Sequence, residues 1–184
     1  HARLAPPAGG VRVVIDTDAA NEIDDPFAIA WALLSPERLD VLAVYAAPYS
    51  FEHRRAELLR ARGARDRPHE ASAHDHELLQ QHATMLAHFE HQGWPIETVA
   101  LEPFVPPAEG MRRSLRAVEA VFDVLGQPHA DRVFAGSTRY TRADVAPERS
   151  AAVDHLIATA RAMPSDEPLY VVAIGCVTNI ASAL

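Results

Sequence analysis

The sequence predicts an α/β protein with a mostly parallel, doubly wound sheet and helices on both faces. Short runs rich in β-branched residues alternate with longer stretches of helical periodicity along the 184 residues. This alternation is typical of βαβ units, in which crossover helices cover the faces of a parallel sheet. The composition, 48% hydrophobic and 23% charged, is that of a globular protein. We expect a single α/β domain over residues 1–184, with no internal repeat and no clear boundary.

The expected strands are short apolar runs, and the expected helices are longer and amphipathic or apolar. Strands are predicted at 11–16, 39–47, 131–136 and 168–175. Helices are predicted at 26–35, 52–62, 111–126 and 149–163, and a further helix begins at 177. Residues 64–93 are less regular and carry a helical stripe of apolar residues, and 94–107 are expected to form a loop with one short strand.

Several residues mark the expected helix ends. Asp25 is the predicted N-cap of the helix at 26–35, with Pro26 in its first turn. Gly63 and Gly126 are the predicted stops of the helices at 52–62 and 111–126, since glycine is favoured just beyond a helix C-terminus.

The charge and the cysteine content exclude several classes of function. The net charge of -8 argues against a nucleic-acid or anionic-membrane partner, because both select basic surfaces. The single cysteine, Cys176, excludes a disulfide framework and a multi-cysteine zinc site. The apolar runs are too short to span a bilayer, and the opening HARLAPPAGG has no signal-peptide core, so we expect a cytoplasmic protein.

A dense acidic loop follows the first predicted strand. Five carboxylates lie within ten residues, in the segment DTDAANEIDD that runs from Asp16 to Asp25. Crowding like charges beside a buried strand end costs several kcal/mol unless a cation compensates. The side-chain ligands on offer are all oxygens, which suits Ca²⁺ best and Mg²⁺ less well. The alternative is a solvated loop in which Asp24 and Asp25 cap the next helix.

Two motifs resemble those of the inosine–uridine nucleoside hydrolase family. VVIDTDAANEIDDPFAIAWALL is similar to the strand–DTD–DD–helix signature of that family, in a divergent DTD-x-x-NE-x-DD form. PLYVVAIGCVTNIASAL at 168–184 is similar to the later strand–G-x-L-T-N-x-A–helix motif. The resemblance implies a nucleoside hydrolase-like fold. It also implies hydrolysis of the N-glycosidic bond of ribonucleosides by a Ca²⁺-activated water, giving ribose and free base.

The resemblance also implies roles for individual residues. Asp18 would be a calcium ligand and the base that takes a proton from water, and Asp25 would be a second ligand. The main-chain carbonyl of Ile174 would be a third. Asp24 would bind the attacking water and a ribose hydroxyl, and Asp16 would support the site. Carboxylates in such a site would also stabilise, by electrostatic attraction, the positive charge that develops on the ribose as the bond breaks.

The sequence departs from the family pattern in two ways. The first motif has a longer turn without Pro-Gly, so Asn21 or Glu22 could enter the pocket, and we take Asn21 as a substrate-binding residue. Family members run to about 300 residues, and their last calcium-ligand aspartate with its adjacent histidine would lie beyond residue 184. We therefore expect this chain to be the N-terminal portion of such a domain, poorly soluble alone, and a homo-oligomer at full length.

Other readings of the sequence remain open. The chain could be a non-catalytic member of the family that binds a nucleoside or ribose. VVIDTD also fits the strand end of haloacid-dehalogenase-like, Mg²⁺-dependent phosphatases, in which Asp16 would be the nucleophile. The histidines at 74, 76, 88 and 91 could ligate a transition metal, but an exposed polar helix face explains them better. Cys176 is expected to be a buried structural thiol.

Overall fold

The computed structural model describes residues 9–99 and 104–184. Within these residues the chain forms four strands and six helices in a mixed order. The strands are β1 (Val11–Thr17), β2 (Leu39–Ala46), β3 (Val133–Ala135) and β4 (Tyr170–Ala173). The helices are α1 (Asp24–Leu33), α2 (Glu52–Asp66), α3 (Ala73–His91), α4 (Pro107–Val124), α5 (Ala151–Ala162) and α6 (Thr178–Ala183).

The chain divides into two compact units, a finer division than the single domain that the sequence predicts. Unit 1 comprises residues 1–49 and 107–184, and unit 2 comprises residues 50–106. Unit 1 contains all the described strands together with α1, α4, α5 and α6, whereas unit 2 contains α2 and α3. Unit 2 is therefore a helical insertion between β2 and α4.

The sheet of unit 1 is four-stranded and entirely parallel, in the order β3-β2-β1-β4. β1 pairs with β2 along its whole length, with a register shift between Val13 and Val14, and with β4 from Val13 to Asp16. The predicted α/β class is confirmed. β1 lies at the centre and is the most buried strand, as its run of β-branched residues predicts.

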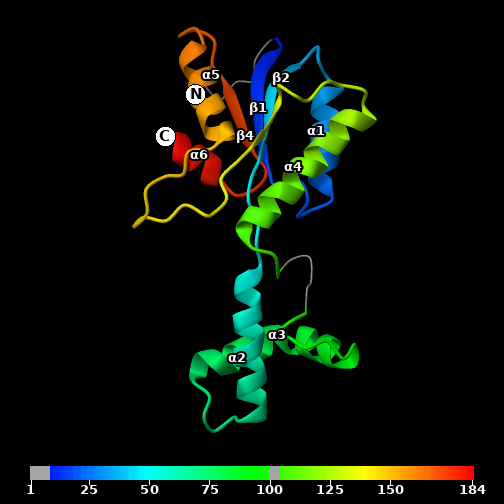
Figure 1. Cartoon of the computed structure of the whole chain (residues 1–184), viewed down its shortest axis with the longest axis vertical. Helices are drawn as coiled ribbons and strands as arrows, with labels where there is room; N and C mark the ends of the chain where they lie inside the picture. Colours follow the sequence, from blue (N-terminus) through cyan, green and yellow to red (C-terminus); the bar gives the residue numbers. More distant parts are fainter. Residues whose placement is uncertain (1–8, 100–103) are drawn as a thin grey trace. The chain divides into compact units, whose positions relative to one another are not determined.

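Helices cover both faces of this sheet (Figure 1). Alternate residues of β1 point to opposite faces: Val13 and Ile15 pack in a cluster with α1 and α4, whereas Val14 packs in a cluster with α5. Phe122 of α4 is fully buried in the first cluster. Tyr45 of β2 is fully buried in the second. The doubly wound arrangement follows directly from these two apolar clusters.

Two parts of unit 1 leave apolar side chains in solvent. The outer face of α1 carries Phe27 and Trp31, each 71% exposed, and is flanked by Ile23 and Leu34. β4 is an edge strand in which the side chains of Tyr170, Val171 and Val172 are 38%, 40% and 42% exposed.

The predicted helix ends are partly wrong. α1 begins at Asp24 with Ile23 as its N-cap, and no side chain caps it, so Asp25 lies inside the first turn. Gly63 lies within α2, which continues to Asp66, because a favourable run of helix-forming residues surrounds it. Gly126 is confirmed as a helix stop: it has a φ of 64°, which glycine adopts without strain.

Unit 2 is a pair of helices around its own apolar cluster. Leu58 of α2 packs with Leu78, Leu86 and Phe89 of α3. The irregular stretch predicted at 64–93 is in fact largely the helix α3, which begins with a capping box between Ser72 and Asp75. Residues 94–99 and 104–106 form no strand. The remainder of the loop predicted at 94–107, residues 100–103, lies outside the described residues.

Among the helices that the structure describes, none has the length and apolar character needed to cross a membrane.

Candidate functional site

The candidate site lies at the carboxyl ends of β1 and β4. From β1 the chain crosses through α1 to β2 on one side, whereas β4 lies on the other side of β1. The direction of winding reverses between β1 and β4, and ligands of open α/β sheets bind at such a switch point. Both sequence motifs end here, which is why residues so far apart along the chain share one place.

A cavity of about 530 Å³ opens at this switch point. Its lining residues come from the loop after β1, from the start of α1 and from the end of β4: Asp18, Asn21, Glu22, Asp24, Asp25, Ala28, Ile174 and Gly175. The structure therefore brings together Asp18, Asn21, Asp24, Asp25 and Ile174, as the site hypothesis requires. Asp16 does not line the cavity and is fully buried behind it.

Asp18 is nearly buried and is held by the turn that follows it. The Asn21 main-chain nitrogen donates to the Asp18 carbonyl at 2.6 Å, and Asn21 Nδ2 donates to Asp18 Oδ2 at 3.1 Å. Asn21 thus orients the carboxylate from within the longer turn. The sequence predicts that Asn21 binds substrate. In the structure, the Asn21 side chain donates a hydrogen bond to Asp18.

Asp25 is also buried, although it lies on the first turn of a helix. The Thr17 hydroxyl donates to Asp25 Oδ2 at 2.6 Å, which ties the helix start to the end of β1. This bond replaces the capping role that the sequence predicts for Asp25. Asp24, on the same turn, is exposed at the cavity.

Two carboxylates of the cavity, those of Asp18 and Asp25, have raised pKa values. Burial, and then the charge of Asp25, raise the pKa of Asp18 to about 6. Burial is also the main cause of the raised pKa of Asp25, with further contributions from the charges of Asp24 and Glu22. None of the residues that line the cavity is basic. The site therefore concentrates negative charge that no side chain among these lining residues balances.

Asp16 forms a buried polar centre behind the cavity with Asn179. Asn179 Nδ2 donates to Asp16 Oδ1 at 2.8 Å, and Asp16 Oδ2 has no hydrogen-bond partner among the described residues. Burial raises the pKa of Asp16 to about 7, and the charge of Asp18 adds to the effect. An orphaned carboxylate oxygen this close to a carboxylate-lined cavity is costly in the absence of a positive charge.

The donor set fits a hard divalent cation. Asp18, Asp25 and the Ile174 carbonyl offer only oxygen, the ligand that Ca²⁺ prefers, and Gly175 leaves room for close approach to Asp18. Among the described residues, no three acidic, histidine or cysteine side chains gather closely enough to hold one ion. A main-chain carbonyl and water would therefore have to supply the rest of the calcium shell.

Three residues of this region were not singled out as functional by their sequence signals. Thr17 fixes Asp25, Gly175 faces Asp18, and Asn179 binds Asp16. The signal for Thr17 and Gly175 is their position at the ends of β1 and β4. Asn179 has a weaker signal in the sequence, namely an amide residue at the start of the helix that follows β4.

The alternative sites are less well supported by the structure. His74 faces Glu77 on the exposed surface of α3, and His88 contacts Trp94 edge-on. Both contacts agree with an exposed polar face of α3. His155 Nδ1 lies 2.9 Å from the Tyr45 hydroxyl, inside the cluster beneath α5.

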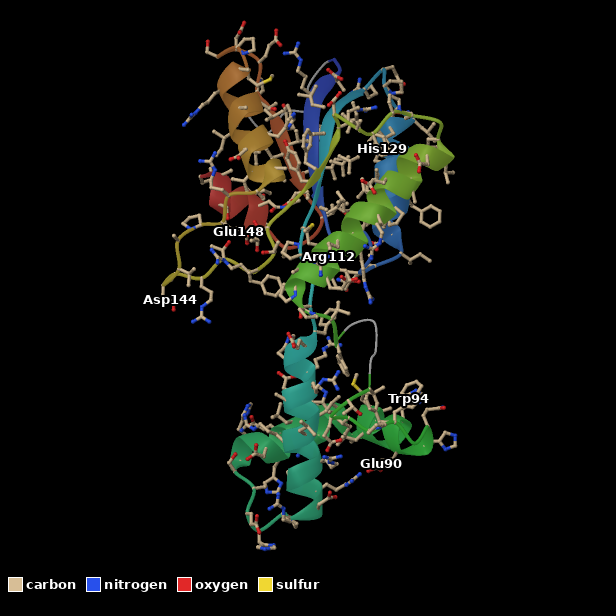
Figure 2. The ribbon with its side chains drawn as sticks, viewed as in Figure 1. Glu90, Trp94, Arg112, His129, Asp144 and Glu148 are labelled. Carbon is tan, nitrogen blue, oxygen red and sulfur yellow. The ribbon has the colours of Figure 1, made fainter. Side chains whose placement is uncertain are left out.

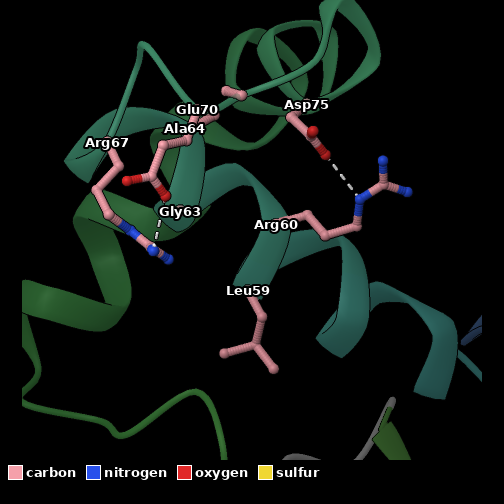
Figure 3. Close-up of a pocket in the computed structure, with 8 residues that line it drawn as sticks. Leu59, Arg60, Gly63, Ala64, Arg67, Glu70 and Asp75 are labelled. Atoms are coloured by element: carbon pink, nitrogen blue, oxygen red, sulfur yellow. Dashed lines mark hydrogen bonds and ion pairs between the residues drawn. The ribbon is translucent and has the colours of Figure 1, made fainter.

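Unit 2 has a cavity of its own, of about 330 Å³, between the end of α2 and the start of α3 (Figure 3). Two arginines line it, but Arg60 pairs with Asp75 and Arg67 pairs with Glu70. These ion pairs neutralise the positive charge that an anionic ligand would need.

Comparisons with protein-family models, with curated proteins and with solved structures find no match to this chain.

Proposed function

We propose that this chain is a nucleoside hydrolase-like protein, which uses Ca²⁺ as a cofactor to hydrolyse the N-glycosidic bond of ribonucleosides. The observation that carries the proposal is that Asp18, Asp25 and Ile174 line one cavity at the switch point of the sheet. Two motifs at opposite ends of the sequence supply these groups. Their meeting is what a shared cation would require.

In the proposed reaction, the residues of the chain bind the sugar and move one proton. When bound, Ca²⁺ supplies positive charge that lowers the pKa of water and attracts vicinal hydroxyl groups. Asp18 accepts a proton from the attacking water, whose oxygen forms a bond to C1′ of the ribose. The C1′–N bond breaks, its electron pair leaves with the base, and the base takes up a proton from solvent, to which Asp18 then releases the proton that it accepted. The products are ribose and free base.

Asp24 and Asp25 have separate parts in this scheme. Asp24 is exposed at the cavity and can accept a hydrogen bond from a ribose hydroxyl. Asp25 is held by Thr17 and contributes fixed negative charge. Negative charge around the sugar stabilises the positive charge that develops on it as the bond to the base weakens.

The test is release of ribose from inosine and uridine by the purified chain, measured as reducing sugar. We expect release that a chelator abolishes and Ca²⁺ restores, and that Asp18→Asn lowers at least 100-fold, in keeping with the loss of a general base. Asp144→Asn is the matched control, because Asp144 is an exposed aspartate that pairs with Arg142. Ribose release that persists in Asp18→Asn would contradict the assignment.

A non-catalytic nucleoside- or ribose-binding protein is the second candidate. It is favoured by the small number of side-chain ligands, since the described residues offer fewer than three acidic groups to one ion. Saturable binding of inosine in the presence of Ca²⁺, without release of ribose, would support it. A phosphatase is disfavoured because Asp16, its required nucleophile, is fully buried and bound to Asn179.

A further inference from the structure

Asn179 makes hydrogen bonds to three segments that are distant in the sequence. Its side chain is fully buried. Nδ2 donates to Asp16 Oδ1 at 2.8 Å and to the Ala46 carbonyl at 3.3 Å, and Oδ1 accepts from the Ser137 main-chain nitrogen at 2.8 Å. One amide side chain thus satisfies a carboxylate, a carbonyl and a main-chain N–H in the interior.

These partners mark the ends of different strands. Asp16 is in β1, Ala46 ends β2, and Ser137 follows β3, while Asn179 itself lies just beyond β4. Asn179 therefore joins the carboxyl ends of all four strands. Gly136 shows how tightly this junction is packed, because a β-carbon there would strike the Ala46 carbonyl and the Asn179 amide.

The loop beyond Ser137 is fastened to the same junction. The main-chain nitrogen and the hydroxyl of Thr138 both donate to Glu148, at 3.0 and 2.7 Å, which closes the loop before α5. Glu148 is labelled in Figure 2. The Thr141 hydroxyl donates to the Thr178 carbonyl at 3.4 Å. The loop that follows Ser137 is thus itself held in place.

The short connection after β4 is bound to Asp16 at both ends. At its start, the Ile174 main-chain nitrogen donates to the Asp16 carbonyl at 2.9 Å. At its end, Asn179 donates to the Asp16 side chain. Between these two attachments lies Gly175, against which Asp18 packs. The position of the Ile174 carbonyl relative to Asp18 therefore depends on both attachments.

We propose that Asn179 is a positioning residue of the cation site, which holds the Ile174 carbonyl and Asp18 at the separation that one cation requires. This inference rests on the proposed function only in so far as that function needs a cation at Asp18, Asp25 and Ile174. Asn179 is not among the residues that line the cavity, and it acts through Asp16 and the main chain of the connection after β4.

The experiment measures cation binding by the full chain, without substrate. Terbium(III) luminescence with competition by Ca²⁺ gives the affinity, and circular dichroism gives the melting temperature and confirms that each variant is folded when affinity is measured. For Asn179→Ala we expect an affinity 10- to 100-fold weaker, the usual effect of losing a group that orients metal ligands. Wild-type affinity in folded Asn179→Ala would overturn the proposal.

Ser150→Ala controls for a general loss of stability. The Ser150 hydroxyl accepts a hydrogen bond from the Val153 main-chain nitrogen at the start of α5, so its removal lowers the melting temperature without touching the site. We expect unchanged cation affinity in this variant. An affinity loss equal to that of Asn179→Ala would show that any destabilisation weakens binding, and would overturn the positioning role.

A double variant keeps the proposal testable where Asn179→Ala does not fold. Asp16→Asn combined with Asn179→Asp restores an amide-to-carboxylate hydrogen bond with its direction reversed, and keeps the net charge. We expect the double variant to bind the cation at least threefold more tightly than Asn179→Asp alone, in which two carboxylates face each other, and equal affinity of these two variants would overturn the proposal. If the wild-type chain binds no cation at all, the proposed function fails with it, whereas loss of the positioning role alone leaves wild-type binding intact.

Discussion

Gly175 lies so close to Asp18 that a β-carbon at position 175 would stand 2.7 Å from the Asp18 main-chain nitrogen and 2.7 Å from its Oδ1. No side chain fits there without displacing the carboxylate or the connection after β4. The contact brings the ends of β1 and β4 together at the cavity. It also makes Gly175 a sensitive point at which to test the site.

We therefore expect Gly175→Ala to weaken Ca²⁺ binding at least tenfold, since changes in the groups that orient metal ligands have effects of this size. The measurement is competition between Ca²⁺ and terbium(III) on the folded variant. Gly63→Ala is the matched control, because a β-carbon at Gly63 within α2 meets nothing within 4 Å. It should stabilise the chain by up to about 1 kcal/mol and leave the affinity unchanged. Equal affinity in Gly175→Ala and the wild type would contradict this reading of the contact.

The stability of the metal-free chain should fall as the pH rises from 4 to 7. The pKa values are raised in the folded state, to about 7 for Asp16 and about 6 for Asp18, from 3.8 in the unfolded chain. In this range the folded chain binds more protons than the unfolded chain, so the free energy of unfolding decreases with pH. The buried Asp16 alone would account for a change on the order of 4 kcal/mol.

Denaturant unfolding at a series of pH values, in the presence of a chelator, measures this dependence. Asp16→Asn should flatten it, because the variant has no proton to lose at that position. A stability that rises between pH 4 and pH 7 in the wild type would show that these carboxylates are balanced by positive charge in the metal-free chain.

Calcium should stabilise the folded chain, and the melting temperature should rise with the concentration of Ca²⁺. A cation that binds only the folded state adds about 2.7 kcal/mol at a concentration 100 times its Kd. We expect a higher melting temperature with Ca²⁺ than with Mg²⁺ at equal concentration, and no increase in Asp25→Asn. Asp144→Asn should respond like the wild type. A wild-type melting temperature that ignores Ca²⁺ would argue against the site.

The outer face of α1 should limit solubility, which is the behaviour that the sequence predicts for the isolated chain. Phe27 and Trp31 are largely exposed, and contiguous apolar surface of this kind promotes association. Phe27→Glu with Trp31→Glu should raise the soluble concentration several-fold, with little change in melting temperature because neither side chain is packed in the core. Light scattering at increasing concentration tests this. A double variant that melts much earlier would show that the face is packed in solution.

The sequence predicts the sheet well because its signal is local. The short apolar runs at 11–16 and 39–47 contain β-branched residues and are typical of strands buried on both faces, and they form β1 and β2. The acidic loop is equally visible, since carboxylates beside a buried strand end demand compensation wherever the chain folds. The fold class and the carboxylates of the cavity follow from such local patterns, whereas Ile174 is expected only from the resemblance of residues 168–184 to a family motif.

The remainder depends on contacts that no local pattern reveals. Asp25 has the spacing of a helix cap, but the Thr17 hydroxyl, eight residues away, binds it instead. Asn179 lies in a short helix, and its three partners are all more than 40 residues away. Histidines and glutamines interrupt the apolar stripe of α3, although the capping box of Ser72 and Asp75 marks its start.

The exposed edge of the sheet has a consequence for how the protein behaves on heating. β4 is short, carries no charged side chain, and presents two valines beside main-chain groups on the side away from β1. In natural proteins, lysine, proline or a β-bulge in an edge strand prevents pairing with strands of other molecules. Without that protection, strands from partly unfolded neighbours can add to β4, so thermal inactivation should be irreversible and should accelerate with protein concentration.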